Sequence, residues 1–216
     1  MITITGCNKG GAGKSTTGTN LAVGLAEDGH DVCLVDADPQ RTSSKVWFAE
    51  REAANLEPRI TLIEKRDNIA STLLSLDQKF DHVVVDVAGR NSRELITGAT
   101  VADLIIAPHQ CSQFDLDTLV ELQDQMVKVR DLNPKLRVLV YQAMASTNPK
   151  VKDTERAEFL AYLAEFPEFE VLNAVGYSRK IYKDAGAYGQ SVMERSRNSE
   201  AAKEIRALIQ EVYGHA

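Results

Sequence analysis

Short apolar segments alternate with longer amphipathic segments along this chain. The segments that predict strands are residues 2–7, 31–36, 60–64, 82–86, 104–108 and 136–142, with a weaker one at 170–174. Several are continuous apolar runs with no polar alternation, such as Val83–Val84–Val85 and Leu104–Ile105–Ile106. Strands that are apolar on both faces are typical of a parallel sheet covered by helices on each side.

The segments between these strands are long enough for helices. Helices are predicted at residues 14–28, 43–55, 68–78, 92–102, 116–132 and 151–166. A last helix, at about 199–213, carries Ile205, Leu208, Ile209 and Val212 at helical spacing and should pack onto the body. Strand–helix alternation predicts a doubly wound α/β fold with a mostly parallel sheet. No linker-like stretch divides the chain, so residues 1–216 are predicted to form a single domain.

Composition narrows the class of protein. The chain has 216 residues, 44% of them hydrophobic and 26% charged, which suits a globular fold that needs no disulfide or metal. The chain has three cysteines, an odd number, and they are widely spaced at Cys7, Cys33 and Cys111. This pattern favours a reducing compartment over a set of disulfides. The sequence contains no run of about 18 apolar residues, and the four histidines lack ligand spacing. We therefore expect a cytoplasmic protein with no signal peptide and no zinc site.

Charge is unevenly distributed. The net charge is −6, yet residues 176–206 hold seven Lys or Arg against four Asp or Glu. A local basic face on an acidic body can attract phosphate, with strong salt dependence. The candidate phosphate contacts are Arg179, Lys180, Lys183, Arg195 and Arg197. An ordinary solvated helical surface would give the same pattern.

The most specific motif follows the first predicted strand and opens the first predicted helix. It reads Lys9, Gly10, Gly11, Ala12, Gly13, Lys14, Ser15, Thr16. Glycines allow the backbone N–H groups to turn toward phosphate oxygens, and the helix N-terminus adds partial positive charge. Lys14 can reach the β- and γ-phosphates, and the Ser15 hydroxyl can ligate Mg²⁺. Its position between strand and helix argues against a glycine-rich turn without a ligand, and predicts a P-loop NTPase fold.

Aspartates end two of the predicted strands. Asp36 and Asp38 lie two residues apart and share a face of an extended strand, and Asp86 follows three valines. Carboxylates at the C-terminal edge of a parallel sheet point into the crevice where ligands bind. Asp36, Asp38 and Asp86 are therefore candidate Mg²⁺ ligands together with Ser15, and Gly89 could meet the γ-phosphate. Asp38 could instead cap the next helix.

The motif from Lys9 to Thr16 resembles the deviant Walker A motif of the ParA/MinD family of ATPases. Asp36–Ala37–Asp38–Pro39–Gln40 resembles the DxDPQ switch of that family. Residues 105–116 and 182–205 resemble its later segments, closest to short ParF-like plasmid partition ATPases. After Asp86, however, Ala88 and Gly89 stand where many family members have prolines.

The resemblance implies a function. ATP and Mg²⁺ would join two copies face to face, with Lys9 reaching the phosphates of the partner. Lys9, Lys14, Asp38 and Asp36 would be catalytic, Asp38 helping to position the hydrolytic water. The dimer would bind DNA without sequence preference through the basic C-terminal region and so lie on the nucleoid. A centromere- or cargo-binding partner, which would also supply specific DNA binding, would stimulate hydrolysis and so drive plasmid or chromosome partition.

Alternative functions remain open. The same chemistry could position a carboxysome or a chemoreceptor cluster. A MinD-like membrane switch would require a basic amphipathic C-terminal helix, whereas the apolar stripe here is expected to face the core, so no stable membrane association is predicted. A small-molecule ligase or kinase of the dethiobiotin synthetase type would depend on a small substrate. Contacts to the adenine base are not evident, although the segment after Gln142 is a candidate.

Overall fold

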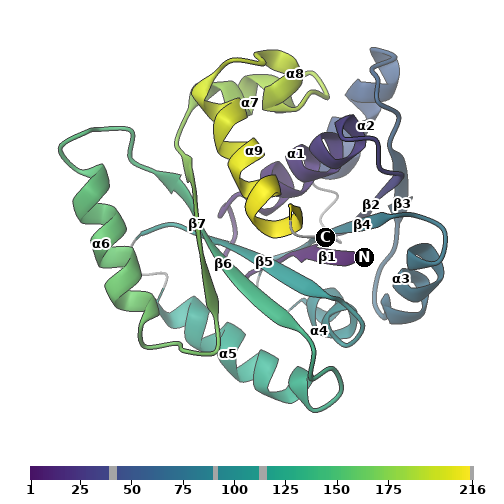
Figure 1. Cartoon of the computed structure of the whole chain (residues 1–216). Coiled ribbons are helices and arrows are strands. Elements are labelled where there is room, and N and C mark those ends of the chain that lie inside the picture. Colours follow the sequence, from purple (N-terminus) through teal and green to yellow (C-terminus); the bar gives the residue numbers. More distant parts are fainter. Residues whose placement is uncertain (39–42, 90–91, 112–115, 215–216) are drawn as a thin grey trace.

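A seven-stranded sheet forms the centre of the molecule. The computed structural model describes residues 1–38, 43–89, 92–111 and 116–214. The strands run in the order β3-β2-β4-β1-β5-β6-β7 (Figure 1), and every neighbouring pair is parallel. Their bounds are β1 Ile2–Thr5, β2 Val32–Ala37, β3 Thr61–Glu64, β4 His82–Val87, β5 Leu104–His109, β6 Arg137–Ala145 and β7 Glu170–Tyr177.

Helices follow the strands in alternation until the end of β7. Their bounds are α1 Lys14–Glu27, α2 Ser43–Ala53, α3 Ala70–Asp77, α4 Arg93–Ala99, α5 Leu116–Arg130, α6 Lys152–Leu163, α7 Lys180–Gly186, α8 Val192–Arg195 and α9 Glu200–Tyr213. The predicted doubly wound α/β fold is confirmed, and all seven predicted strands are present, with bounds shifted by up to three residues.

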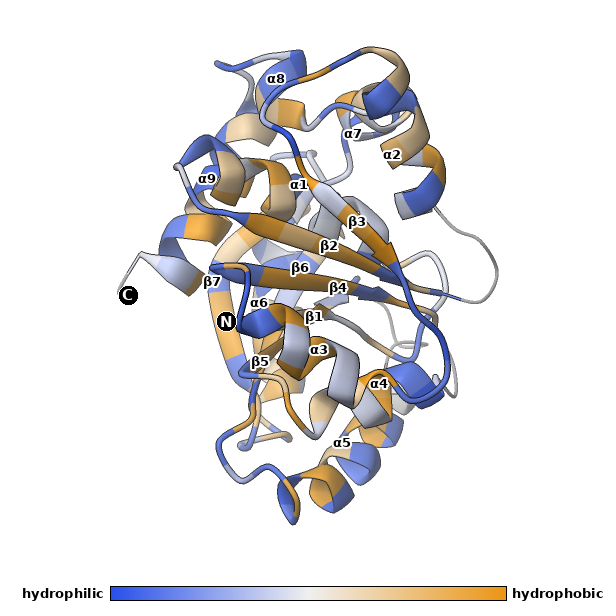
Figure 2. Cartoon of the chain, turned by 90° about the vertical axis from the view of Figure 1, so that its right-hand side faces the viewer, coloured by the Kyte–Doolittle hydropathy of each residue, from blue (hydrophilic) through white to orange (hydrophobic). Residues whose placement is uncertain are grey.

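Two apolar layers hold the helices against the sheet. One contains Leu73 of α3, Leu95 of α4, Leu122 of α5 and Phe159 of α6. The other contains side chains of α1, α2, α7, α8 and α9. Consecutive residues of β4 divide between the layers, because Val84 faces one and its neighbours the other. Figure 2 shows these apolar strands between helices that turn hydrophilic sides outward.

The C-terminal helix is part of the body, as expected. Ile205, Leu208 and Ile209 are buried, and α9 packs against β7 and α1. The apolar stripe that a membrane-binding helix would need therefore lies in the core. None of the helices that the structure describes is long and apolar enough to cross a bilayer.

Helices α7 and α8 are not expected from the apolar pattern. Each is short, and a helix of one or two turns is marginal without tertiary contacts. Here Ala185 of α7 and Val192 of α8 are buried, and Ser191 and Glu194 cap α8 reciprocally. Packing and capping, rather than periodicity along the chain, stabilise this segment.

Candidate functional site

The phosphate-loop motif lies between β1 and α1, at the carboxyl edge of the sheet. Gly11 and Gly13 have φ angles of 72° and 97°, a region that side chains with a Cβ rarely adopt. Gly13 directly precedes α1, and its carbonyl accepts from the Thr17 amide at 2.8 Å. The loop therefore turns as the motif requires and presents the helix N-terminus to the crevice.

Lys14 and Lys9 meet within this loop. The Lys14 side chain is buried, and its Nζ donates to the Lys9 carbonyl oxygen at 2.6 Å. Lys9 itself is half-buried. Two positive charges thus lie on one short loop, one on each side of its glycines.

Two neighbouring segments fix the position of the loop. Asn8 is fully buried, and its Nδ2 donates to Oε1 of Gln125 on α5 at 3.1 Å. Gly89, after β4, approaches so closely that a Cβ there would lie 3.1 Å from the Gly10 nitrogen. The segment that follows Asp86 therefore abuts the phosphate loop, as the expected role of Gly89 requires.

Asp36 and Asp86 lie side by side at the ends of adjacent strands. They are register partners in the β2–β4 pair, and both are fully buried. Oδ1 of Asp36 accepts from the Asp38 amide at 3.0 Å and lies 3.4 Å from Nη2 of Arg66. Burial raises the pKa of Asp36, while the Asp38 amide and Arg66 oppose that rise.

Asp86 is held by a hydroxyl from α2. The Ser44 Oγ donates to Asp86 Oδ2 at 2.6 Å, and both side chains are fully buried. Burial raises the pKa of Asp86 to about 6, although hydrogen bonding from Ser15 and Ser44 and the charge of Lys14 lower it. Asp36 adds to the rise, because two carboxylates so close together disfavour a second negative charge.

The donor set at this point fits Mg²⁺. Asp36 Oδ2 and Asp86 Oδ1 are buried oxygens with no hydrogen-bond partner among the described residues. Such oxygens are costly to bury unless a ligand satisfies them. Within the described ranges, His, Cys, Asp and Glu form no group of three that would hold a metal by itself. Mg²⁺ usually keeps several waters and takes one or two protein oxygens plus phosphates, so this set is sufficient.

Asp38 lies next to this pair and is largely buried. Its amide donates to Asp36, which fixes the chain at the end of β2. Pro39 and Gln40 of the expected switch lie outside the described residues. The role of Asp38 in positioning the hydrolytic water stays a prediction.

A pocket of about 180 Å³ opens beside the start of α1. Its walls come from the first turn of α1, from Ala143 and Met144 at the end of β6, and from Gly176–Tyr177–Ser178 at the end of β7. Tyr182 of α7 closes another side. The segment after Gln142, a candidate for base contacts, therefore borders a cavity next to the phosphate loop.

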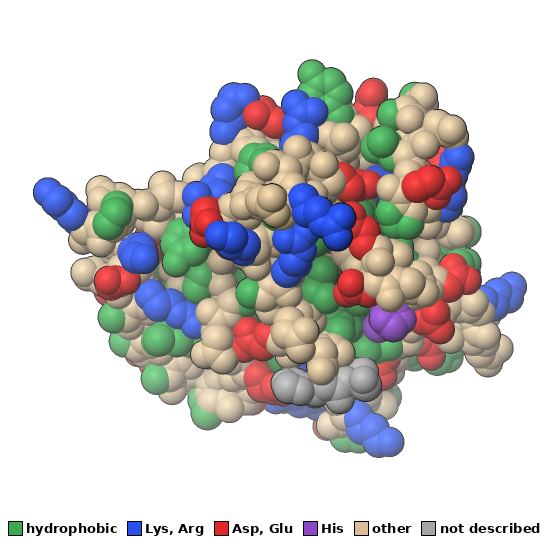
Figure 3. Space-filling model, turned by 45° about the horizontal axis from the view of Figure 1, so that its top comes forward, with side chains coloured by type: hydrophobic (Ala, Val, Ile, Leu, Met, Phe, Trp, Pro, Cys, Tyr) green, Lys and Arg blue, Asp and Glu red, His purple; other side chains and the backbone are tan. Residues whose placement is uncertain are grey.

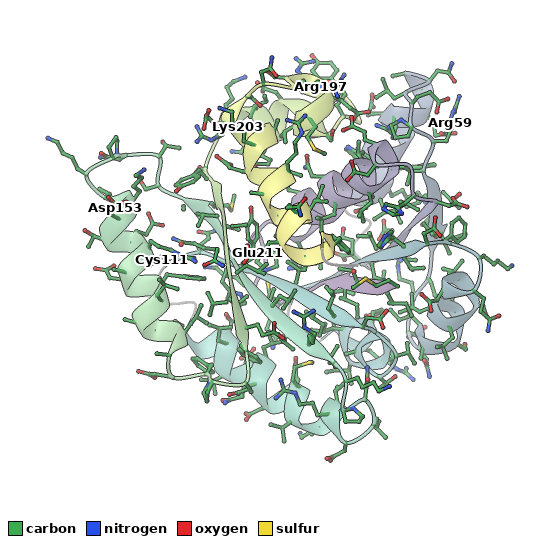
Figure 4. All side chains as sticks on the ribbon, in the orientation of Figure 1. Arg59, Cys111, Asp153, Arg197, Lys203 and Glu211 are labelled. Atoms are coloured by element: carbon green, nitrogen blue, oxygen red, sulfur yellow. The ribbon has the colours of Figure 1, made fainter. Side chains whose placement is uncertain are left out.

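The candidate DNA contacts lie around α7, α8 and the start of α9. In Figure 3, Lys and Arg side chains gather at this end of the molecule among acidic ones, and Figure 4 places Arg197 and Lys203 there. All four acidic residues of 176–206 form ion pairs. The pairs are Lys180–Asp184, Arg51–Glu194, Lys203–Glu200 and Arg179–Glu204.

These ion pairs divide the candidates into two groups. Arg179 is half-buried, lies 2.6 Å from Glu204 and also lines the pocket, so it has internal contacts. Lys180 is exposed but paired with Asp184. Lys183, Arg195 and Arg197 are exposed, and within the described residues no carboxylate lies within ion-pair distance of them. Arg206 shares these properties and is not among the sequence-based candidates, and the charges of Arg206 and Arg197 both lower the pKa of Glu27.

Sequence reasoning missed Ser44 and Arg66. Arg66 comes two residues after β3. Its position near the carboxyl end of a parallel strand, where ligands bind, could have indicated that it belongs to the site. Ser44 gives no such signal, because a serine in the first turn of a helix is usually a local capping residue. Its contact with Asp86 spans 42 residues.

A parallel sheet with a phosphate loop after β1 and aspartates at the ends of β2 and β4 defines a P-loop nucleotide-binding protein. Residues 2–192 match the family described as the CobQ/CobB/MinD/ParA nucleotide binding domain. The chain belongs to this family, which confirms the resemblance drawn from its motifs.

Similar proteins cover nearly the whole chain. The maintenance of carboxysome distribution protein A of Halothiobacillus neapolitanus is 29% identical, over 94% of this chain and 92% of its own. The chromosome-partitioning ATPase Soj of Thermus thermophilus is 28% identical, over 94% of this chain and 92% of its own.

Solved structures share the fold. The cell division ATPase MinD of Pyrococcus furiosus superposes with a TM-score of 0.79 at 16% identity, over 100% of this chain and 99% of its own. MinD of Pyrococcus horikoshii, complexed with Mg-ADP, gives 0.75 at 16% identity, over 98% and 95%. A complex of a Cyanothece McdA variant with ATP gives 0.72 at 16% identity, again over 98% and 95%.

Proposed function

We propose that this protein is a ParA-type ATPase that forms an ATP-dependent sandwich dimer and positions DNA by binding it without sequence preference. The observation that carries the proposal is the meeting of a two-lysine phosphate loop with two buried carboxylates. Asp36 and Asp86 each keep one oxygen without a partner among the described residues. A glycine-rich turn with only a structural role needs neither the two lysines nor the buried carboxylates. Both features suit the binding of a Mg²⁺-nucleotide.

The pocket and the loop suggest how the nucleotide lies. We place the base in the pocket between β6 and β7, and the phosphates over the amides of Gly10 to Ser15. When bound, Mg²⁺ would neutralise charge on the β- and γ-phosphates. Ser15 and Asp86 would hold it, with Asp36 beside them. Asp38, at the end of the same strand as Asp36, is placed to orient a water.

Lys9 is the residue from which we infer the dimer. Lys14, five residues later, already supplies a cation from within the loop. A second lysine five residues earlier is useful if it reaches the phosphates of a facing copy, because a cation supplied in trans stabilises charge on the transferred phosphoryl group. ATP would thereby join two copies, and hydrolysis would separate them.

The cargo is proposed to be plasmid or chromosomal DNA. The exposed cations around α7 and α8 would contact phosphates, and a centromere-binding partner would stimulate hydrolysis. The protein would then lie in the cytoplasm and on the nucleoid when ATP is bound. A second candidate, the positioning of a different cargo, is favoured by the 29% identity to a carboxysome distribution protein.

The test compares the wild type with Lys9→Gln. Lys9→Gln should bind ATP with wild-type affinity, since Lys14 is intact, but stay monomeric and fail to hydrolyse ATP. Mass photometry with a non-hydrolysable ATP analogue measures the dimer, and phosphate release measures turnover. The matched control is Lys79→Gln. Lys79 is an exposed lysine between α3 and β4, at the amino ends of the strands and so away from the phosphate loop.

Full ATPase activity of Lys9→Gln would refute the role in trans. A wild type that stays monomeric with every nucleotide would refute the dimer itself. Turnover that requires a small organic substrate would favour the ligase or kinase class instead.

A further inference from the structure

Helix α2 spans the distance between the nucleotide site and the segment formed by α7, the following turn and α8, here called the α7–α8 segment (residues 180–195). The motifs along the chain assign α2 no role. In Figure 1, α2 lies beside α1, on the same face of the sheet as α7 and α8.

One end of α2 contacts the carboxylate proposed to hold Mg²⁺. Ser44 is fully buried, and its hydroxyl donates to Asp86 Oδ2 at 2.6 Å. That leaves Oδ1, which has no other partner among the described residues, as the oxygen available to a metal-bound water. Together with the Ser15 hydroxyl, Ser44 therefore fixes the orientation in which Asp86 presents this oxygen.

The other end of α2 is attached to the α7–α8 segment. Trp47 is 3% exposed, and its Nε1 donates to the Gln190 carbonyl oxygen at 3.1 Å. Arg51 is 1% exposed, and its Nη1 donates to the Gly189 carbonyl oxygen at 3.1 Å and to Glu194 Oε1 at 3.0 Å. Glu194 also accepts from the backbone amide of Ser191, the N-cap of α8, in a capping box.

Ser44, Trp47 and Arg51 occupy positions i, i+3 and i+7 of one helix. This spacing places them on the same face, one above another. All three are buried, whereas Lys45 and Val46 between them are exposed. A single buried stripe thus runs from Asp86 to the turn before α8, and a helix is stiff enough to transmit a shift along it.

We propose that Ser44 is a positioning residue for Asp86, and that α2 couples the Mg²⁺-nucleotide site to the α7–α8 segment through Trp47 and Arg51. The proposal rests on the proposed nucleotide function and deepens it. The same segment carries exposed cations, including Lys183 and Arg195. By reciprocity, a polyanion that binds the segment changes the affinity for Mg²⁺-nucleotide, and the nucleotide changes the affinity for the polyanion.

The first test separates metal-dependent from metal-free nucleotide binding. The dissociation constant of fluorescent ADP is measured with Mg²⁺ and with EDTA. Ser44→Ala should reduce the gain in affinity that Mg²⁺ provides by about tenfold, as expected for a residue that orients a metal-binding carboxylate. Affinity in EDTA should stay at the wild-type value. Ser75→Ala, an exposed serine of α3, should match the wild type in both conditions.

The second test acts from the distant end. Trp47→Phe keeps an aromatic ring but removes the hydrogen bond to Gln190, and it touches neither nucleotide nor metal. It should reduce the Mg²⁺-dependent gain by about threefold, the size of one neutral hydrogen bond. It should also weaken the effect that a short DNA duplex has on Mg²⁺-nucleotide affinity in the wild type.

The outcomes are distinct. If wild-type protein binds no nucleotide, the proposed function fails. If the wild type binds Mg²⁺-nucleotide but Ser44→Ala shows the same Mg²⁺ dependence, the positioning role is wrong while the function stands. If Ser44→Ala behaves as expected but Trp47→Phe equals the wild type, the coupling through α2 is overturned.

Discussion

At the scale of single residues, Asp86 combines stabilising contacts with an unfavourable environment. Burial disfavours its charge, and neighbouring Asp36 disfavours it further, so the pKa rises from 3.8 to about 6. Hydroxyls of Ser15 and Ser44 and the ammonium of Lys14 offset part of this cost. In the nucleotide-free protein, the negative charge of Asp86 is therefore costly to bury, and a bound divalent cation would offset that cost.

Asp86→Asn should stabilise the nucleotide-free protein. The amide keeps the shape and can still accept from Ser44, but it carries no buried charge. Between pH 3.8 and 6 the folded wild type binds more protons than the unfolded chain, so this group lowers stability as pH rises through that window. Above this pH window, the free energy of unfolding of the variant should exceed that of the wild type by about 1–3 kcal/mol.

Urea unfolding at pH 4 and pH 7.5 measures this difference, which should be large only at pH 7.5. Asp124→Asn, on the exposed side of α5, is the control and should show no such gain. Equal stability of Asp86→Asn and wild type at pH 7.5 would mean that the buried charge is fully compensated.

At the scale of elements, ion pairing divides the basic region. Its acidic residues are all paired, which leaves Lys183, Arg195, Arg197 and Arg206 exposed with no carboxylate within ion-pair distance among the described residues. Arg195 also lies 4.8 Å over the Tyr188 ring, which restricts its side chain. These cations, rather than Arg179, are the stronger candidates for phosphate contacts.

Lys183→Glu combined with Arg195→Glu should weaken DNA binding evenly across sequences. It should also lower the slope of log affinity against log salt by about 1 for each phosphate that the variant no longer binds. Fluorescence anisotropy with two unrelated duplexes over a salt series measures both. Lys128→Glu, on α5 across the sheet, is the matched control. Unchanged affinity in the double variant would place the DNA surface elsewhere.

At the scale of the whole molecule, the two edges of the sheet differ in chemistry. The carboxyl ends of the strands hold the proposed nucleotide site, whereas His82 lies at the amino ends, and its ring meets those of His30 and Tyr213 edge-on. The Tyr213 hydroxyl and Thr3 Oγ1 are 3.0 Å apart, which joins the last helix to the first strand. Burial, His30 and the N-terminus lower the pKa of His82 from 6.5 to about 4, against a small opposing effect of Asp81.

Acid should therefore destabilise the fold through His82. Between pH 6.5 and 4 the unfolded chain binds a proton that the folded protein excludes, so stability falls as pH decreases through this window. His82→Phe keeps a ring but cannot titrate, and should flatten this part of the profile. Urea midpoints at pH 7 and pH 5 for both proteins check it. An equally steep fall in the variant would assign the effect to other groups.

The amino-acid sequence by itself determined the local features of this protein. Apolar runs such as 83–85 predict buried parallel strands because both faces of each strand need cover. The phosphate loop is equally local, since its glycines, Lys14 and Ser15 lie within eight consecutive residues. Family membership followed from these contiguous motifs.

Only the tertiary structure decided which distant groups meet. Asp36 and Asp86 are neighbours because β2 pairs with β4 in one register, and Ser44 reaches Asp86 across 42 residues. Arg66 lies beside Asp36 because the fold brings them together. Helices α7 and α8 form because tertiary packing and capping stabilise them, and no local sequence pattern predicts either outcome. The motifs of the proposed nucleotide site are contiguous in the sequence, whereas the proposed coupling between that site and the α7–α8 segment depends on packing.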